Sequence, residues 1–243
     1  MIGVLVNTFA IAVGAIIGVI FKKALSEKVT SAVMTVMGIA TFIIGLQAAL
    51  KVEKTLLLVI SIAVGTAIGT IIDIDKYVNR LGEYLKKVFA SRNKGELNSK
   101  FAEAFASTSI LFAVGAMSVL GSIDAGLKHD YNILFIKSAM DFVASIMYAA
   151  SLGIGVAFSA ITIFVFQGLV ALFASNLKFL VDNPGMMNEF SAVGNLLVMT
   201  IGLNLMGVTK VKVANMLPAI VIVLVLYKLI YIGLEYNICQ LSM

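Results

Sequence analysis

Long, uninterrupted apolar runs place the strongest limit on what this chain can fold into. Of its 243 residues, 60% are hydrophobic and 13% are charged, and the mean hydropathy is +1.04. A helix needs about 20 mostly apolar residues to cross a bilayer. The chain, residues 1–243, is therefore predicted to be a single all-α domain, a polytopic transmembrane helical bundle of seven or eight spans. The eight candidate segments are Ile2–Phe21, Thr30–Leu50, Thr55–Ile72, Phe105–Ile123, Ile133–Leu152, Gly155–Ser175, Phe190–Met206 and Val213–Ile232.

Two of these segments contain helix-breaking residues. Phe105–Ile123 holds Gly115 and Gly121 together with five Ser or Thr residues, so we expect this span to be broken or re-entrant. Pro218 removes one intrahelical hydrogen bond, and we expect it to kink or interrupt the last span.

Basic residues concentrate in the connections that follow alternate spans. The net charge of +5 is thus distributed as a topology signal, which argues against binding of nucleic acid. By the positive-inside rule, the long segment 73–100 lies in the cytoplasm and both termini lie outside. Within it, Ile74–Phe89 has the pattern of an amphipathic helix on the cytoplasmic leaflet or of an ordinary juxtamembrane anchor, and Ala90–Ser99 reads as a flexible connector.

The two ends of the chain show a weak internal repeat. Three short motifs recur in order, at separations of 160, 157 and 159 residues, so that spans one to three match spans six to eight. With eight crossings the two copies would be inverted, as in many secondary transporters, although short apolar motifs also recur by chance. The motif pairs are Ser31–Val33 with Ser191–Val193, Ile44–Leu46 with Ile201–Leu203, and Lys51–Val52 with Lys210–Val211.

Glycines four residues apart occur twice, at Gly14 and Gly18 and at Gly65 and Gly69. Small residues at this spacing let helix backbones approach closely. We read both motifs as sites of internal packing, with dimerisation as the alternative.

Asp141 is the most informative polar residue, because it lies midway along the apolar run Ile133–Leu152. Ionisable residues in membrane spans usually face a protein interior or a hydrated cavity and mark a transport pathway. Lys137 precedes Asp141 by four residues and can pair with it, and Ser138 and Ser145 recur on the same helix face. One interpretation is a proton, cation or substrate site, and the other is a self-neutralised pair that only stabilises packing.

Further polar or unusual residues extend this candidate site. Gly153 and Gly155 lie between two apolar runs, where they predict either an unwound element inside the membrane or a tight turn at its surface. Asn7, Ser159, Gln167 and Asn195 lie in other spans and predict a polar interior, with Asn7 and Ser159 at equivalent positions of the repeat.

Metal, cofactor and enzyme chemistry have little support in the sequence. Asp124, His129 and Asp130 sit in a short polar loop with nothing to fix their geometry, and they include the only histidine. Cys239 is the only cysteine, and the chain has no phosphate-binding loop, nucleophile elbow or zinc-protease motif. We therefore expect no cofactor, no metal site and no enzymatic activity.

The motifs around the candidate site resemble a family of uncharacterised bacterial membrane proteins of unknown function, the YdfK-like and YqgA-like proteins (domain of unknown function 554). The resemblance covers nearly the whole chain and implies a multi-pass protein of the bacterial plasma membrane and a transport role without an established substrate. Ala116 and Asn195 depart from the family pattern, where proline and glycine are expected. The motifs are Lys137-Ser138-x-x-Asp141, Gly153-x-Gly155-Val156-x-x-Ser159-Ala160, Gln167-Gly168, Gly202-Leu203-Asn204-Leu205 and Ala214-Asn215-Met216-Leu217-Pro218-Ala219.

Together these features predict a secondary transporter or exporter of a small polar solute or ion. Asp141 is the expected coupling or binding carboxylate, and the expected partners are the lipid bilayer, the transported solute and a second copy of the chain. An ion channel and a non-transporting membrane scaffold remain the alternatives.

Overall fold

The computed structural model describes residues 1–24, 26–89 and 100–241, and the side chains of residues 1–22, 26–85 and 101–230. The described residues are 88% helical and include no strand, and seven of the helices are long and apolar enough to cross a membrane. The predicted all-α transmembrane bundle is therefore confirmed. In chain order the elements are α1 (Ile2–Ala24), α2 (Glu27–Ala49), α3 (Thr55–Ile72), α4 (Ile74–Phe89), α5 (Lys100–Ala113), α6 (Ala116–Leu127), α7 (Asn132–Leu152), α8 (Gly155–Leu172), α9 (Ala174–Asp182), α10 (Pro184–Leu205), η1 (Val213–Met216) and α11 (Pro218–Leu241).

The predicted broken span is confirmed as the pair α5 and α6, which bend by 60° at Val114 and Gly115. Together the two helices are long and apolar enough to form an eighth span. The last predicted span is also interrupted, because the 3-10 turn η1 ends and α11 begins at Pro218. Proline is favoured at the first position of a helix, where its missing N–H would have no partner.

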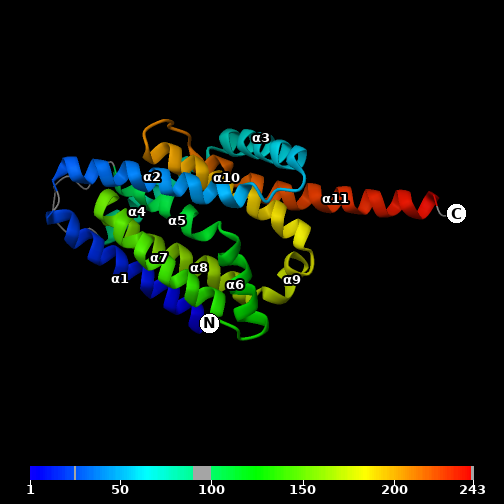
Figure 1. Ribbon diagram of the computed structural model, residues 1–243, viewed down its shortest axis with the longest axis horizontal. Helices are drawn as coiled ribbons and strands as arrows, with labels where there is room; N and C mark the ends of the chain where they lie inside the picture. The colour runs from blue at the N-terminus through cyan, green and yellow to red at the C-terminus, as the bar shows by residue number, and fades with distance from the viewer. Residues whose placement is uncertain (25, 90–99, 242–243) are drawn as a thin grey trace.

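The long helices form two groups (Figure 1). We call α1, α6, α7 and α8 the first bundle, and α2, α3, α10 and α11 the second bundle. The largest contacts of each helix lie within its own group, whereas α2 with α7, and α5 with neighbours in both groups, join the two. Helix α5 thus runs between two packed units, and α6 belongs to the first of them.

Helices α1 and α8 bury equivalent positions. Each fully buried side chain of α8 lies 152 positions after a fully buried side chain of α1. The two helices therefore bury the same face when their sequences are aligned as copies of the repeat. On α1 these are Val4, Asn7, Ile11 and Ala15, and on α8 they are Val156, Ser159, Ile163 and Gln167.

The second bundle repeats this pattern with its other two pairs. A Cβ added at Gly38 would lie 2.9 Å from the Gly202 carbonyl oxygen, and one added at Gly45 would lie 2.8 Å from that of Asn195. These contacts make α2 and α10 antiparallel, as the predicted inverted repeat requires. The buried residues Leu57, Ser61, Gly65 and Gly69 of α3 likewise precede the buried residues Asn215, Ala219, Val223 and Tyr227 by 158 positions.

The direction of the helices explains the role of the broken span. Gly3 contacts Leu134 and Gly14 contacts Phe142, so α1 and α7 are parallel. The chain reverses between α1 and α2 and again between α2 and α3, so α3 has the direction of α7 (Figure 1). Since α3 ends where α7 also ends, α5 and α6 together must carry the chain back across the bundle.

The predicted amphipathic helix is present as α4, which packs against α5 and η1. Ile74 and Val78 contact the core of the second bundle, while Tyr77 and Arg80 are exposed on the opposite side. The Asn215 side chain accepts a hydrogen bond from the Asp75 backbone N–H at 2.8 Å and fixes the start of the helix. The connector Ala90–Ser99 lies outside the described residues.

Candidate functional site

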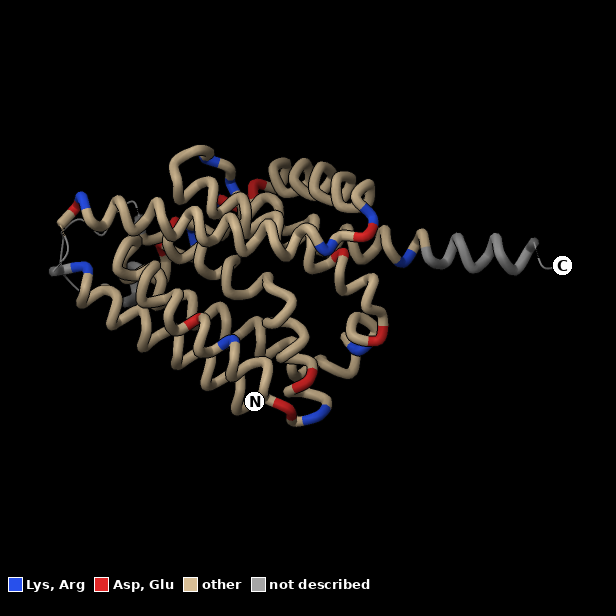
Figure 2. Tube along the Cα trace, in the orientation of Figure 1, with Lys and Arg blue, Asp and Glu red and all other residues tan. Residues whose placement is uncertain are grey.

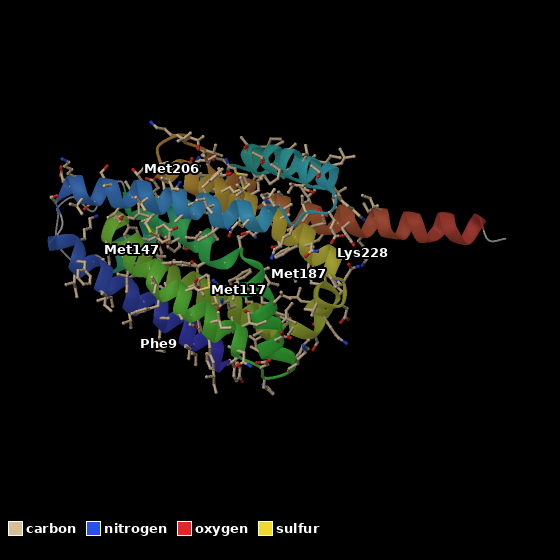
Figure 3. All side chains as sticks on the ribbon, viewed as in Figure 1. Phe9, Met117, Met147, Met187, Met206 and Lys228 are labelled. Carbon is tan, nitrogen blue, oxygen red and sulfur yellow. The ribbon has the colours of Figure 1, made fainter. Side chains whose placement is uncertain are left out.

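A central cavity of about 400 Å³ lies between the two bundles. Helices α2 and α10 form one wall, and α7 and the α5–α6 break form the other. Met117, labelled near the middle of the bundle in Figure 3, is one of its lining residues. The cavity is lined by Met37, Ala40, Thr41, Ile44, Ala48, Lys51, Leu111, Phe112, Gly115, Ala116, Met117, Lys137, Met140, Asp141, Ala144, Tyr148, Ser191, Asn195 and Val198.

Lys137 and Asp141 form a buried ion pair in the wall of this cavity. The Lys137 ammonium group donates to both carboxylate oxygens of Asp141, at 2.9 and 2.8 Å, and the two side chains are 9% and 8% exposed. The i, i+4 spacing on α7 places them side by side, as the sequence predicts. The pair lowers the cost of holding either charge in the membrane, and loss of a proton from Lys137 or gain of one by Asp141 would break it.

Thr41 and Tyr148 close one end of the cavity. Their hydroxyl groups hydrogen-bond to each other and join α2 of the second bundle to α7 of the first. Lys51, which is exposed, lies at the other end of the cavity where α2 ends. Ile44 and Met140, which line the cavity between α2 and α7, are also exposed, at 56% and 55%. The cavity is therefore accessible near Lys51 and along the side between α2 and α7, whereas near Tyr148 a hydrogen bond between the bundles crosses it.

Asn195 gives the α10 wall a polar surface. Its amide nitrogen donates to the Ser191 carbonyl at 2.8 Å and to the Ser191 hydroxyl at 3.2 Å. Within the described part of the chain, its side-chain oxygen accepts no hydrogen bond. This leaves an acceptor for a bound solute on the wall that faces Asp141.

The α5–α6 break adds backbone dipoles to the cavity. Gly115 is the N-cap of α6, with φ −66° and ψ 143°, and offers no side chain to the first amides of that helix. Its surroundings are open, since an added Cβ would meet nothing within 4 Å. The start of a helix carries a partial positive charge, and transporters of known mechanism bring such half-helix ends to their substrate.

The structure brings three of the predicted site residues to the cavity, namely Lys137, Asp141 and Asn195. Ser138 donates to the Leu134 carbonyl, Ser145 to that of Asp141 and Ser159 to that of Val156. These serines therefore satisfy their own helices, and none of them lines the cavity.

Asn7 and Gln167 lie behind the ion pair and form a bridge between α1, α8 and α6. The Asn7 amide donates to the Gln167 side-chain oxygen at 3.3 Å, and the Gln167 amide donates to the Ser118 hydroxyl at 2.9 Å. Asn7 also lies within reach of the Asp141 carboxylate. The bridge thus connects the neighbourhood of the ion pair to the first turn of α6, although neither amide lines the cavity.

Gly153 and Gly155 lie at the turn between α7 and α8, away from the cavity. Gly153 has φ +93°, which favours glycine, and a Cβ at Gly155 would approach the Phe101 carbonyl oxygen at 2.5 Å. The unwound element that faces the cavity is the α5–α6 break.

Sequence reasoning missed Thr41, Tyr148 and Ser118. Thr41 and Tyr148 are single polar residues within apolar runs, and no local pattern connects residues 107 positions apart.

Two other groups of charged residues have local roles. Asp124 pairs with Lys128 at 2.8 Å, and Asp130 accepts from the Asn132 backbone N–H at 3.0 Å. Among the described residues, no three His, Cys, Asp or Glu side chains are placed to hold a metal ion. Glu189 is fully buried and accepts from the backbone N–H groups of Glu53 and Lys54, so it caps the start of α3.

Comparison with known proteins identifies the family. The family model of the Protein of unknown function (DUF554) matches residues 2–228. The chain is 32% identical over 226 residues to the uncharacterized membrane protein YdfK of Bacillus subtilis, covering 91% of this chain and 93% of that protein. It is 29% identical over 222 residues to the uncharacterized protein YqgA of Escherichia coli, covering 91% of this chain and 94% of that protein. No solved structure matches the chain. The chain belongs to the DUF554 family of membrane proteins, the family that its motifs resemble.

Proposed function

We propose that this protein is a secondary transporter that moves a small polar solute or ion across the bacterial plasma membrane. The observation that carries the proposal is the central cavity, which reaches the Lys137–Asp141 pair from the end near Lys51. A scaffold whose polar residues only hold helices together has no need of a cavity beside the buried Lys137–Asp141 ion pair.

The arrangement of the bundles supports alternating access. The cavity lies at the interface between the bundles, and the Thr41–Tyr148 bond crosses that interface at its closed end. Breaking this bond while closing the end near Lys51 would expose the same residues to the opposite side. Inverted repeats supply two such states of similar energy in many transporters.

The proposed orientation places the α4 end of the bundle in the cytoplasm and both termini outside. Charged residues gather at the ends and loops of the bundle, and few lie along the long helices (Figure 2). The basic residues of 73–100 and of the connections after α1 and α10 would lie on the cytoplasmic side. The cavity would then open outward, near Lys51.

Asp141 is the proposed coupling or binding group. When it accepts a proton or a cation, its bond to Lys137 weakens, and the ammonium group becomes available to a solute in the cavity. The exchange of partners links occupancy by an ion to binding of the solute, which is the requirement for coupled transport.

The test begins with a screen for ligands. Purified protein is heated with amino acids, organic anions and metal ions in turn, because a solute that binds the folded state raises the melting temperature. The variant Ala144→Phe, which fills the cavity, should lose the shift. Val143→Phe, the same kind of insertion on the exposed side of α7, should keep it.

A solute found in this way is then tested for uptake into proteoliposomes with an imposed proton or sodium gradient. Asp141→Asn should abolish gradient-driven uptake. The double variant Lys137→Met/Asp141→Asn restores a neutral interior and should remain inactive although its stability recovers. Undiminished uptake by Asp141→Asn would overturn the proposal, and flux that never saturates would favour the channel.

A further inference from the structure

A second cavity, of about 430 Å³, lies on the opposite face of α5 from the central cavity. Its walls come from the helices α4, α5, α6, α8, α9, α10 and α11. Leu217, which lies between η1 and α11, also lines it. Residues of α4 line one end and residues of α9 line the other. The cavity is therefore a long slot between the bundles.

The slot opens beside α4. Leu81 is 51% exposed, more than any other residue that lines the slot. Deeper lining residues such as Leu180 and Phe190 are 3% and 7% exposed. An occupant would thus enter past Leu81 and extend toward α9.

The lining of the slot offers almost no polar partner. Its two hydroxyl groups, Ser109 and Thr162, are hydrogen-bonded to each other at 3.0 Å. A water molecule needs two to four polar partners to be held in a cavity, and a polar solute would lose its hydration here without compensation. An empty slot would forfeit dispersion contacts along its whole lining. The chemistry of the slot fits a hydrocarbon chain.

The charge of α4 indicates what the hydrocarbon chain is attached to. Four basic residues and two acidic residues lie in this helix, namely Lys76, Arg80, Lys86 and Lys87 against Asp75 and Glu83. Arg80 is exposed, directly precedes Leu81, and stacks over the Tyr77 ring at 6.0 Å. A basic, exposed helix at a membrane surface attracts anionic lipid headgroups.

We propose that the slot is a binding site for an anionic phospholipid, whose headgroup lies at α4 beside Arg80 and whose acyl chain fills the space from Leu81 toward Leu180. The lipid would occupy the seam between the two bundles, opposite the central cavity. This site is independent of whether the central cavity transports a solute.

The absence of tryptophan from the chain permits a direct test. Phe190→Trp places a single fluorophore in the slot, and the protein is reconstituted into phosphatidylglycerol vesicles with brominated or unbrominated acyl chains. Bromine quenches tryptophan on contact, so we expect strong quenching of Phe190→Trp by the brominated lipid. Val225→Trp, on the lipid-facing side of α11, should be quenched as well, whereas Phe112→Trp, buried on the other face of α5, should not.

Two further variants fix the interpretation. Adding Ala106→Phe to Phe190→Trp fills the slot and should remove the quenching. Adding Arg80→Glu to Phe190→Trp tests the headgroup, and it should reduce the preference for brominated phosphatidylglycerol over brominated phosphatidylcholine. Leu180→Trp serves as the reporter if Phe190→Trp does not fold. Quenching no greater than that of Phe112→Trp, or quenching that survives Ala106→Phe, would overturn the proposal. Equal quenching by both lipids would overturn its anionic headgroup.

Discussion

At the scale of single residues, the buried ion pair of Lys137 and Asp141 is the feature with the largest expected effect on stability. Removing one member of a buried pair leaves an uncompensated charge, which typically costs about 3–5 kcal/mol, whereas replacing both members with neutral groups is often harmless. The pair borders a cavity, so water can reach it and reduce this cost. The two partners are nevertheless expected to depend on each other.

This dependence gives the first residue-scale prediction. Lys137→Met and Asp141→Asn should each lower the free energy of unfolding, by up to about 3 kcal/mol. The double variant should be more stable than either single variant, because it holds no unpaired charge. Unfolding of the purified protein in detergent, followed by circular dichroism, measures all three. Additive losses in the double variant would contradict a coupled pair.

The second residue-scale prediction concerns the hydroxyl pair at the closed end of the cavity. Tyr148→Phe and Thr41→Val should each cost roughly 0.5–1.5 kcal/mol, the net contribution of one hydrogen bond, and the double variant should cost about as much as either alone. If the bond also holds the cavity closed, Tyr148→Phe should increase the reactivity of a cysteine placed at Met37 toward a water-soluble thiol reagent. Unchanged reactivity would separate the bond from closure.

At the scale of helices, the glycine motifs determine how closely the spans pack. The close approaches of Gly14 to α7 and of Gly65 to α11 confirm the prediction of internal packing. Gly14→Ala would bring a Cβ within 2.5 Å of the Phe142 carbonyl oxygen, so the backbones would have to separate.

We therefore expect Gly14→Ala to lower the stability by about 1–3 kcal/mol, the usual cost of overpacking. Gly168→Ala is the matched control, because its added Cβ would meet only the end of the Met1 side chain, at 3.8 Å. Its higher helix propensity should make it neutral or more stable by up to about 1 kcal/mol. Melting temperatures of the two variants, measured side by side, decide the point. Equal changes in the two variants would show that the close approach of Gly14 to α7 does not control the effect.

The helices also show what the sequence could reveal. Apolar runs define spans because the bilayer demands them, and Asp141 is conspicuous because charge is rare at that depth. By contrast, the cavity depends on how α2, α7 and α10 are placed relative to one another. Long-range pairs such as Thr41 with Tyr148 leave no local pattern. Gly153 and Gly155 lie between apolar runs, as Gly115 lies within one, so the sequence alone cannot tell a surface turn from a break inside the membrane. The packing of Gly155 against Phe101, and the open space around Gly115, distinguish the two.

At the scale of the whole molecule, the two bundles are the units that a transport cycle would move relative to each other. Spin labels can measure this motion once Cys239 is replaced by serine. Distances within a bundle, such as Phe9 to Ile136 or Ile71 to Val221, should stay fixed when the solute found in the screen is added. The distance from Phe9 to Ile71, between the bundles, should change. All four positions are exposed, and Phe9 is labelled on the outer side of α1 in Figure 3. Constant distances in all three pairs would argue against rigid-body alternating access.

The pairing of α2 with α10 and of α3 with α11 has a consequence for biogenesis. Gly38 cannot meet Gly202 until the ribosome has added a further 164 residues, a delay of about ten to thirty seconds at ordinary rates of synthesis. During that time α2 and α3 must remain in the membrane with their glycine faces covered only by lipid or by a chaperone. A chain truncated before α10 would leave those faces permanently uncovered. We therefore expect quality-control proteases to degrade such a chain before the loss of its central cavity has any effect.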